Sequence, residues 1–111
     1  MMTEDTIEEG KPNAIISYLT IIGTIIAFYM NNDKKNEFTS FHVRQALGLW
    51  LTFFALGYII GGFDSWFVTL GWYMFFGVLF IFSFMTAVTG RAEPTPILGK
   101  FYQKLFASLG N

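Results

Sequence analysis

The chain has 111 residues and a formal net charge of −1, which gives no basis for nucleic-acid binding. It has no cysteine, so disulfides and thiolate metal sites are excluded. Hydrophobic residues make up 53% of the sequence and charged residues only 14%, whereas a soluble domain carries about 25% charged residues. The length and composition therefore indicate a small integral membrane protein with a single domain.

Residues 1–13 form a polar segment, which we expect to be a mobile N-terminal tail. The segment lacks the basic start and apolar core of a signal peptide. Its acidic residues are Glu4, Asp5, Glu8 and Glu9. Pro12 suits the first turn of a helix, where no amide donor is needed.

Three apolar runs, at residues 14–30, 46–62 and 66–89, predict three transmembrane helices within a domain of residues 14–90. The first run has no charge and reaches roughly 25 Å, slightly less than a hydrocarbon core of about 30 Å. The third is the clearest, with Trp66 at the expected interface. The predicted fold class is all-α.

Polar residues suited to helix capping precede the second and third runs. Thr39 or Ser40 is expected to cap the second helix, and Asp64 or Ser65 the third. Residues 91–111 follow the last span. Apolar residues recur there at helical spacing, at Ile97, Leu98, Phe101, Leu105 and Leu109, opposite Lys100, Gln103 and Lys104. This pattern predicts an amphipathic helix that lies in the membrane interface.

The basic residues are divided unevenly between the two sides that three spans create. One side carries Lys34, Lys35, Arg44, Arg91, Lys100 and Lys104, and the other carries only Lys11. Because cytoplasmic loops hold the excess of Lys and Arg, this bias predicts an external N-terminus and a cytoplasmic C-terminus.

The strongest candidate for a polar contact site begins the second helix and consists of Phe41, His42, Arg44 and Gln45. His42 and Gln45 share one helical stripe, which Thr52 continues. Such a stripe is expected to bond across to other helices or a partner, or to line a cytoplasm-facing cavity. The alternative is an interfacial helix start whose polar groups reach lipid headgroups.

Arg44 falls to one side of this stripe. We expect it to face headgroup phosphate or the loop carboxylates of Asp33 or Glu37. His42 is the only histidine and has no companion ligand, so no metal site is expected. No carboxylate lies within the apolar runs and no Ser-His-Asp spacing occurs, so we predict that the protein is not an enzyme and needs no cofactor.

Small and mildly polar residues mark one face of each predicted span. They are Ser17, Thr20 and Thr24 with Ala27 on the first, Gly57 and Gly61 on the second, and Ser83 and Ala87 on the third. Such faces allow helices to approach closely. Packing within one bundle is the favoured interpretation, and self-association is the alternative.

A further pattern of sequence motifs extends from about residue 14 to residue 105. The first run ends in Asn-Asn-Asp-Lys-Lys, residues 41–47 read Phe-His-Val-Arg-Gln-Ala-Leu, and the tail carries Pro94, Pro96, Gly99 and Lys100. This pattern resembles a family of small bacterial membrane proteins of unknown function, similar to the import component of the chloroplast inner-envelope translocon. The resemblance implies a bacterial cytoplasmic membrane; the chloroplast relatives have four spans and take part in protein import.

These observations favour an accessory or scaffolding membrane protein, linked through the resemblance to protein translocation or membrane-complex assembly. Its expected partners are membrane lipid and another membrane protein or a second copy of itself. A homo-oligomeric channel or transporter for small solutes is the alternative. That alternative is weakened because the apolar runs contain none of the buried charge that usually marks an ion pathway.

Overall fold

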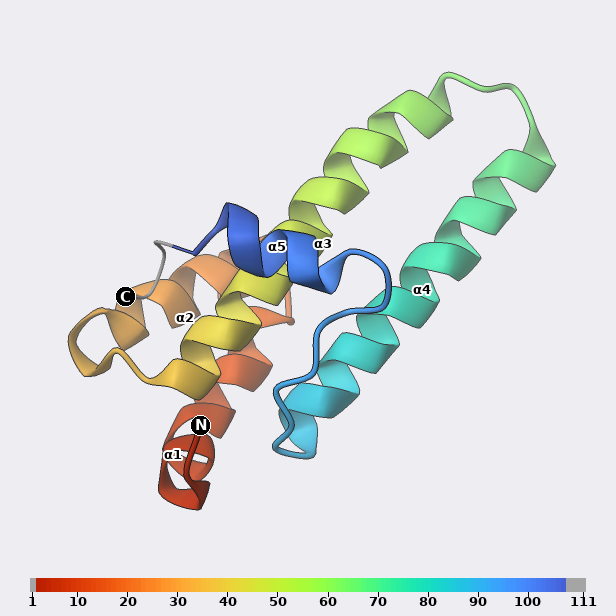
Figure 1. Ribbon diagram of the computed structural model, residues 1–111. Coiled ribbons are helices and arrows are strands. Elements are labelled where there is room, and N and C mark those ends of the chain that lie inside the picture. Colours follow the sequence, from red (N-terminus) through yellow and green to blue (C-terminus); the bar gives the residue numbers. More distant parts are fainter. Residues whose placement is uncertain (1, 108–111) are drawn as a thin grey trace.

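The computed structural model describes residues 2–107, which fold into five helices and contain no strand (Figure 1). The helices are α1 (Glu4–Ser17), α2 (Ile21–Lys34), α3 (Glu37–Gly61), α4 (Trp66–Val88) and α5 (Gly99–Leu105). The two longest helices, α3 and α4, form an antiparallel hairpin. The other three helices gather around the end of this hairpin that is remote from its turn, so the distal halves of α3 and α4 extend beyond them.

Among the described residues, two helices are long and apolar enough to cross a membrane, α3 and α4, and not the three that were predicted. They contain 25 and 23 residues, or roughly 37 and 34 Å, which exceeds a hydrocarbon core of about 30 Å. α4 nearly matches the predicted span, whereas α3 begins well before residue 46. The all-α fold class is confirmed.

The predicted first span, residues 14–30, is wrong because the chain turns between α1 and α2. Thr20 has extended backbone and its hydroxyl accepts a hydrogen bond from the Gly23 amide at 3.1 Å, which caps α2. A side chain at Gly23 would overlap the Ile16 carbonyl, so glycine permits this close turn. α2 contains 14 residues and reaches roughly 21 Å, too short to cross a bilayer.

The N-terminal segment is helical from Glu4 onward, contrary to the predicted tail. The Thr3 hydroxyl accepts from the Thr6 amide at 3.2 Å, and Glu4 and Asp5 lie in the first turn, where the helix dipole favours negative charge. Pro12 lies inside α1 instead of at its start. The carbonyl four residues before it therefore lacks its usual helical donor.

Asn36, and neither Thr39 nor Ser40, caps α3. Its side-chain oxygen accepts from the Thr39 amide at 3.0 Å, and its Nδ2 donates to the Thr6 carbonyl at 2.9 Å. This one side chain therefore starts α3 and holds α1 against it. Ser65 caps α4, as one of the two predicted residues.

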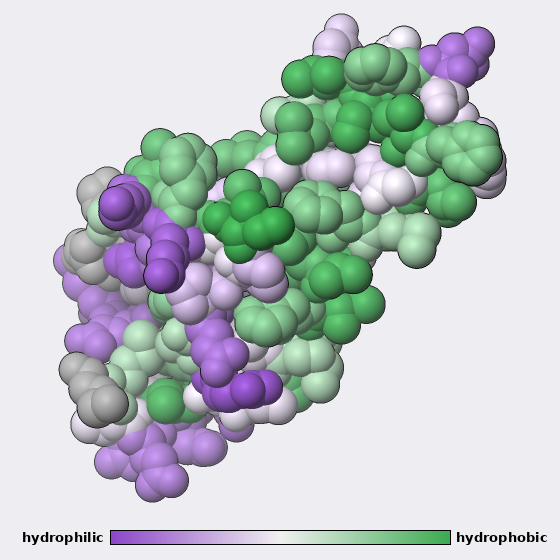
Figure 2. All heavy atoms as spheres, turned by 45° about the vertical axis from the view of Figure 1, so that its right-hand side comes forward, coloured by the Kyte–Doolittle hydropathy of each residue, from purple (hydrophilic) through white to green (hydrophobic). Residues whose placement is uncertain are grey.

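The core lies where α1, α3 and α4 meet. Its buried apolar residues include Ala14, Tyr18, Phe38, Ala46, Leu49, Phe76 and Leu79. Away from this region the hairpin exposes large side chains, among them Tyr58 and Phe67, each 85% exposed. Figure 2 shows apolar residues along the hairpin and most hydrophilic residues at the end opposite its turn.

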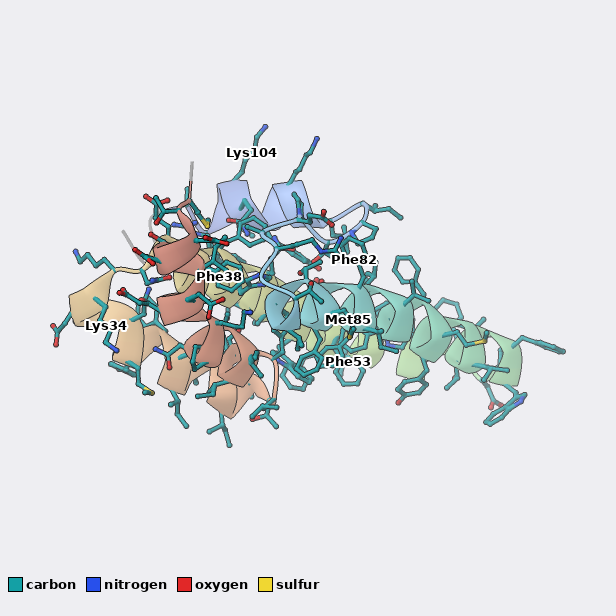
Figure 3. The ribbon with its side chains drawn as sticks, turned by 90° about the horizontal axis from the view of Figure 1, so that it is seen from below. Lys34, Phe38, Phe53, Phe82, Met85 and Lys104 are labelled. Carbon is teal, nitrogen blue, oxygen red and sulfur yellow. The ribbon has the colours of Figure 1, made fainter. Side chains whose placement is uncertain are left out.

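The C-terminal helix α5 is shorter than the predicted amphipathic helix, whose Leu109 lies outside the described residues. Tyr102 is buried against α3, whereas Phe101 and Leu105 are exposed. Figure 3 shows Lys104 extending from α5 away from the other helices. The placement of this helix in a membrane interface stays a prediction.

Candidate functional site

His42 is fully buried on the face of α3 that meets α1 and the segment after α4. Its Nε2 lies 2.8 Å from the Arg91 carbonyl oxygen, and its Nδ1 lies 2.7 Å from the Tyr18 hydroxyl. A carbonyl can only accept, so Nε2 carries the proton and Nδ1 accepts from Tyr18. The neutral imidazole thus has a partner at both nitrogens, each from a different part of the chain.

Gln45 lies one turn further along α3 and is also fully buried. Its Oε1 accepts from the Thr95 amide at 2.7 Å and from the Thr95 hydroxyl, and its Nε2 donates to the Gly99 carbonyl at 3.1 Å. The Ser83 hydroxyl lies 2.6 Å from Thr95 Oγ1, which adds α4 to the network. One amide therefore fastens the segment between α4 and α5 to α3.

Arg44 lies beside this stripe and donates to the C-terminal segment. Nε donates to the Phe106 carbonyl at 3.2 Å and Nη1 to Gln103 Oε1 at 3.3 Å. Gln103 in turn donates to the Phe41 carbonyl at 2.9 Å. These bonds of the guanidinium run to the C-terminal segment. The sequence had instead predicted contacts of Arg44 with Asp33, Glu37 or headgroup phosphate.

Polar side chains of α1 and α2 extend the network toward the start of α3. Thr24 Oγ1 donates to the Ser17 carbonyl at 2.6 Å, and the Ser17 hydroxyl donates to the Ala14 carbonyl at the same distance. Asn31 Nδ2 donates to the Ser40 hydroxyl at 2.9 Å. We call the network centred on His42 and Gln45, together with these groups, the polar seam.

The small residues singled out in the sequence divide into two groups. Ser17, Thr24, Ala27, Ser83 and Ala87 are buried within the chain. Thr20 is exposed and acts as a helix cap. Gly57 is half-buried and Gly61 is exposed, and a Cβ at Gly61 would meet nothing within 4 Å. The glycine pair on α3 is therefore not used for close packing inside this chain.

Buried polar residues that were not singled out from the sequence include Tyr18, Asn31, Thr95 and Tyr102. Tyr18 lies within an apolar run, and its ring also packs edge-on against Phe80 and Phe84. Thr95 stands between two prolines in a segment that reads as a loop. The Tyr102 hydroxyl lies 2.6 Å from Thr52 Oγ1 and ties α5 to the same face of α3.

The buried polar groups of the seam are hydrogen-bonded to one another and to nearby backbone. In the described part of the chain, two buried side-chain polar atoms lack a hydrogen-bond partner, Nε1 of Trp50 and Nε1 of Trp72, and both lie outside the seam. Across residues 2–107, no three His, Asp or Glu side chains are grouped so that they could hold a metal ion. The arrangement is suited to fastening helices together.

A scan of family models, a search of curated proteins and a search of solved structures each found no match to this chain. The fold and the site therefore define its class through physical features alone. It is an all-helical protein with two helices able to cross a membrane and a satisfied polar network at one end of them.

Proposed function

We propose that the protein is a small accessory or scaffolding protein of a membrane, which spans the bilayer with α3 and α4 and presents the distal half of this hairpin to another membrane protein. The observation that carries the proposal is that this distal half packs against no other helix of the described chain (Figure 1). In water, so large an apolar surface would be a liability; in a bilayer, it is available for helix–helix contacts.

The charge distribution supports a topology with both termini in the cytoplasm. Two spans place the N-terminal segment, the α2–α3 connection and the C-terminal segment on one side. All seven Lys and Arg residues of the chain belong to that end, whereas the turn between α3 and α4 carries one charge, Asp64. The positive-inside rule then assigns the turn to the exterior. This proposal replaces the external N-terminus that three spans required.

A groove near the distal end of the hairpin is the contact surface that we favour for the partner. It has a volume of about 250 Å³ and is lined by residues that include Phe53, Gly57, Gly61, Thr69 and Trp72. Glycines spaced four apart let a second helix approach closely. The partner that fits is a transmembrane helix of another protein.

In this proposal the polar seam does not touch the partner. It fixes α1, α5 and the intervening segments around the cytoplasmic half of the hairpin, and so leaves the distal half uncovered. The channel alternative is less favoured, because the buried polar groups bond to one another instead of lining a path. The resemblance of residues 41–47 to the import-component family supports a partner in protein translocation or membrane-complex assembly.

Photo-crosslinking in native membranes tests this function. A photoreactive phenylalanine analogue replaces Tyr58 on the distal hairpin, with Phe101 on α5 as the matched aromatic control. Adducts to a different membrane protein from position 58 alone are the expected result. Adducts at twice the mass of the chain would favour self-association and the channel alternative. The absence of any protein adduct from position 58 would contradict the scaffolding role.

The topology is tested separately by labelling single cysteines. This method suits the chain because it has no cysteine of its own. Single cysteines replace Asp64 in the turn and Glu9 in α1, both exposed. A membrane-impermeant maleimide applied to intact cells is expected to label position 64 and to reach position 9 only after the membrane is opened. Labelling of both positions from outside would contradict the two-span topology.

A further inference from the structure

The α1–α2 pair has the arrangement of a helical hairpin that enters and leaves on the same side. In Figure 1, α1 runs alongside the first half of α3, and α2 returns beside α1. Their connection at residues 18–20 therefore forms the tip of the pair, opposite the end where α1 begins and α2 ends. Charged residues lie at the open end of the pair, with Glu4 and Asp5 in the first turn of α1 and Lys34 in the last turn of α2. The charged residue nearest to the connection in sequence is Lys11. Residues 18–20 carry no charge.

We infer that α1 and α2 form a re-entrant hairpin, which enters the bilayer from the side of the termini, turns within that leaflet, and lays the outer face of α2 against lipid acyl chains. The inference rests on the proposed function only in taking α3 and α4 as the membrane spans. It adds a third membrane-embedded element to a protein with two spans.

The contacts of Tyr18 set the depth of this hairpin. Its ring centroid lies 6.1 Å from that of Phe80 and 6.2 Å from that of Phe84, both on α4. Phe80 lies roughly 12 Å along α4 from the helix end at Val88, at about 1.5 Å per residue. The connection therefore reaches less than half of a hydrocarbon core of about 30 Å.

The two faces of α2 are the reverse of those on a helix of a water-soluble protein. The buried face holds small or polar residues, namely Gly23, Thr24, Ala27 and Asn31. The outer face holds large apolar residues at helical spacing, namely Ile22, Ile25, Ile26, Tyr29 and Met30, which are 46–71% exposed. A helix that turns its polar side inward and its apolar side outward is matched to lipid as its solvent.

Several backbone polar groups of the connection between the helices are bonded within the protein, as lipid requires of backbone outside a helix. The amides of Tyr18 and Leu19 donate to the Ile15 and Ile16 carbonyls, each at 3.1 Å. The carbonyl of Thr20 accepts from the Thr24 amide at 3.0 Å. Thr24 Oγ1 binds the preceding Ser17 carbonyl as well, so the turn carries its own hydrogen bonds into the membrane.

A groove between α2 and α3 makes the lipid-facing surface continuous. It has a volume of about 340 Å³ and is lined by Thr24, Ile25, Phe28, Tyr29, Val43 and Leu47. The groove is mostly apolar, so an acyl chain fits it. Figure 3 shows Lys34 at the end of α2 remote from the connection. A cation at that level is placed to meet anionic headgroups while the outer face of α2 stays among the chains.

Site-directed spin labelling tests the hairpin on the full chain in vesicles of phosphatidylcholine and phosphatidylglycerol. Single cysteines replace Ile22, Ile26, Asn32 and, as the reference on α4, Val78; all four side chains are exposed, so little packing is lost. Accessibility to oxygen, which enters lipid, is compared with accessibility to a water-soluble nickel chelate. Labels at positions 22 and 26 are expected to match position 78 in favouring oxygen, with position 32 favouring nickel.

Depth provides a second readout of the same labels. Position 78 is expected to lie deepest, followed by position 22, with position 32 in water. If positions 22 and 26 meet nickel as freely as position 32 while position 78 stays in lipid, the re-entrant hairpin is wrong and the two spans stand. Protection of position 22 from both quenchers would mean that a second copy covers α2, which also overturns the proposal. Nickel access at position 78 would instead contradict the spans themselves.

Discussion

The Tyr18 hydroxyl lies 2.7 Å from Nδ1 of His42 and joins the end of α1 to the middle of the polar seam. Because the other ring nitrogen donates to the Arg91 carbonyl, the imidazole connects three segments that are distant in sequence. The rings of Tyr18 and His42 also meet edge-on, with centroids 5.5 Å apart. This contact holds α1 in place where the predicted first span breaks.

Tyr18→Phe tests the importance of this bond. The substitution keeps the ring but leaves Nδ1 of His42 buried without a donor, which is expected to cost about 1 to 2 kcal/mol. The thermal aggregation midpoint in detergent is expected to fall. Tyr29→Phe is the matched control, because it removes the hydroxyl of a residue that is 71% exposed. Equal midpoints for the two variants would show that the bond contributes nothing.

Gln45→Leu is expected to release the segment between α4 and α5. Its side chain can no longer accept from Thr95 or donate to Gly99. A loss of about 1.4 kcal/mol would raise the population of the open segment about tenfold, and with it the rate of tryptic cleavage after Arg91. Asn32→Leu makes a similar chemical change at an exposed position. Cleavage at the same rate in both variants would contradict the fastening role of Gln45.

The sequence was sufficient for the parts of the fold that depend on local pattern. The long apolar runs placed α3 and α4, and the spacing of His42 and Gln45 placed both on one stripe of α3. The Ser65 cap follows from a residue type beside a helix start. These features depend on neighbours within a few positions, which a single sequence displays.

The missed features depend on partners far away in the chain. The break after Ser17 relies on the Thr20 cap and on the close approach of Gly23 to the Ile16 carbonyl, whereas composition alone shows an uninterrupted apolar run. The bond from Gln45 to Thr95 joins positions 50 residues apart. No local periodicity marks a threonine between two prolines as the partner of a glutamine on another helix.

Stability at alkaline pH is expected to depend on Tyr102. Burial raises the pKa of this phenol above its ordinary value, and the hydrogen bond with Thr52 offsets that only in part. The folded protein therefore holds the phenolic proton more tightly than the unfolded chain, so stability is lost as pH rises above about 10. Urea midpoints measured from pH 8 upward are expected to fall less steeply for Tyr102→Phe than for the natural chain.

Tyr58→Phe provides the control for that experiment, because it removes the phenolic hydroxyl of a residue that is 85% exposed. The slope of stability against pH is expected to change for Tyr102→Phe and not for Tyr58→Phe. Burial also raises the pKa of Tyr18, so the slope is expected to shrink in the Tyr102 variant without vanishing. Identical slopes in all three proteins would show that Tyr102 does not contribute to the alkaline transition.

Gly48 and Gly77 form a matched pair that tests how α5 is seated. A Cβ at Gly48 would overlap the ring of Tyr102, whereas a Cβ at Gly77 would meet nothing within 4 Å. Alanine is favoured over glycine in a helix by roughly 0.5 to 1 kcal/mol, so Gly77→Ala is expected to leave the thermal midpoint unchanged or raise it. Gly48→Ala is expected to lower it, because overpacking costs about 1 to 3 kcal/mol.

The double variant Gly48→Ala with Tyr102→Ala identifies the source of that loss. If the alanine methyl acts by displacing the tyrosine ring, Gly48→Ala should cost less once the ring is gone, and the two changes will not be additive. If Gly48→Ala instead raises the midpoint as Gly77→Ala does, α5 does not rest on α3 at this position. Additive losses in the double variant would place the effect of Gly48 within α3 itself.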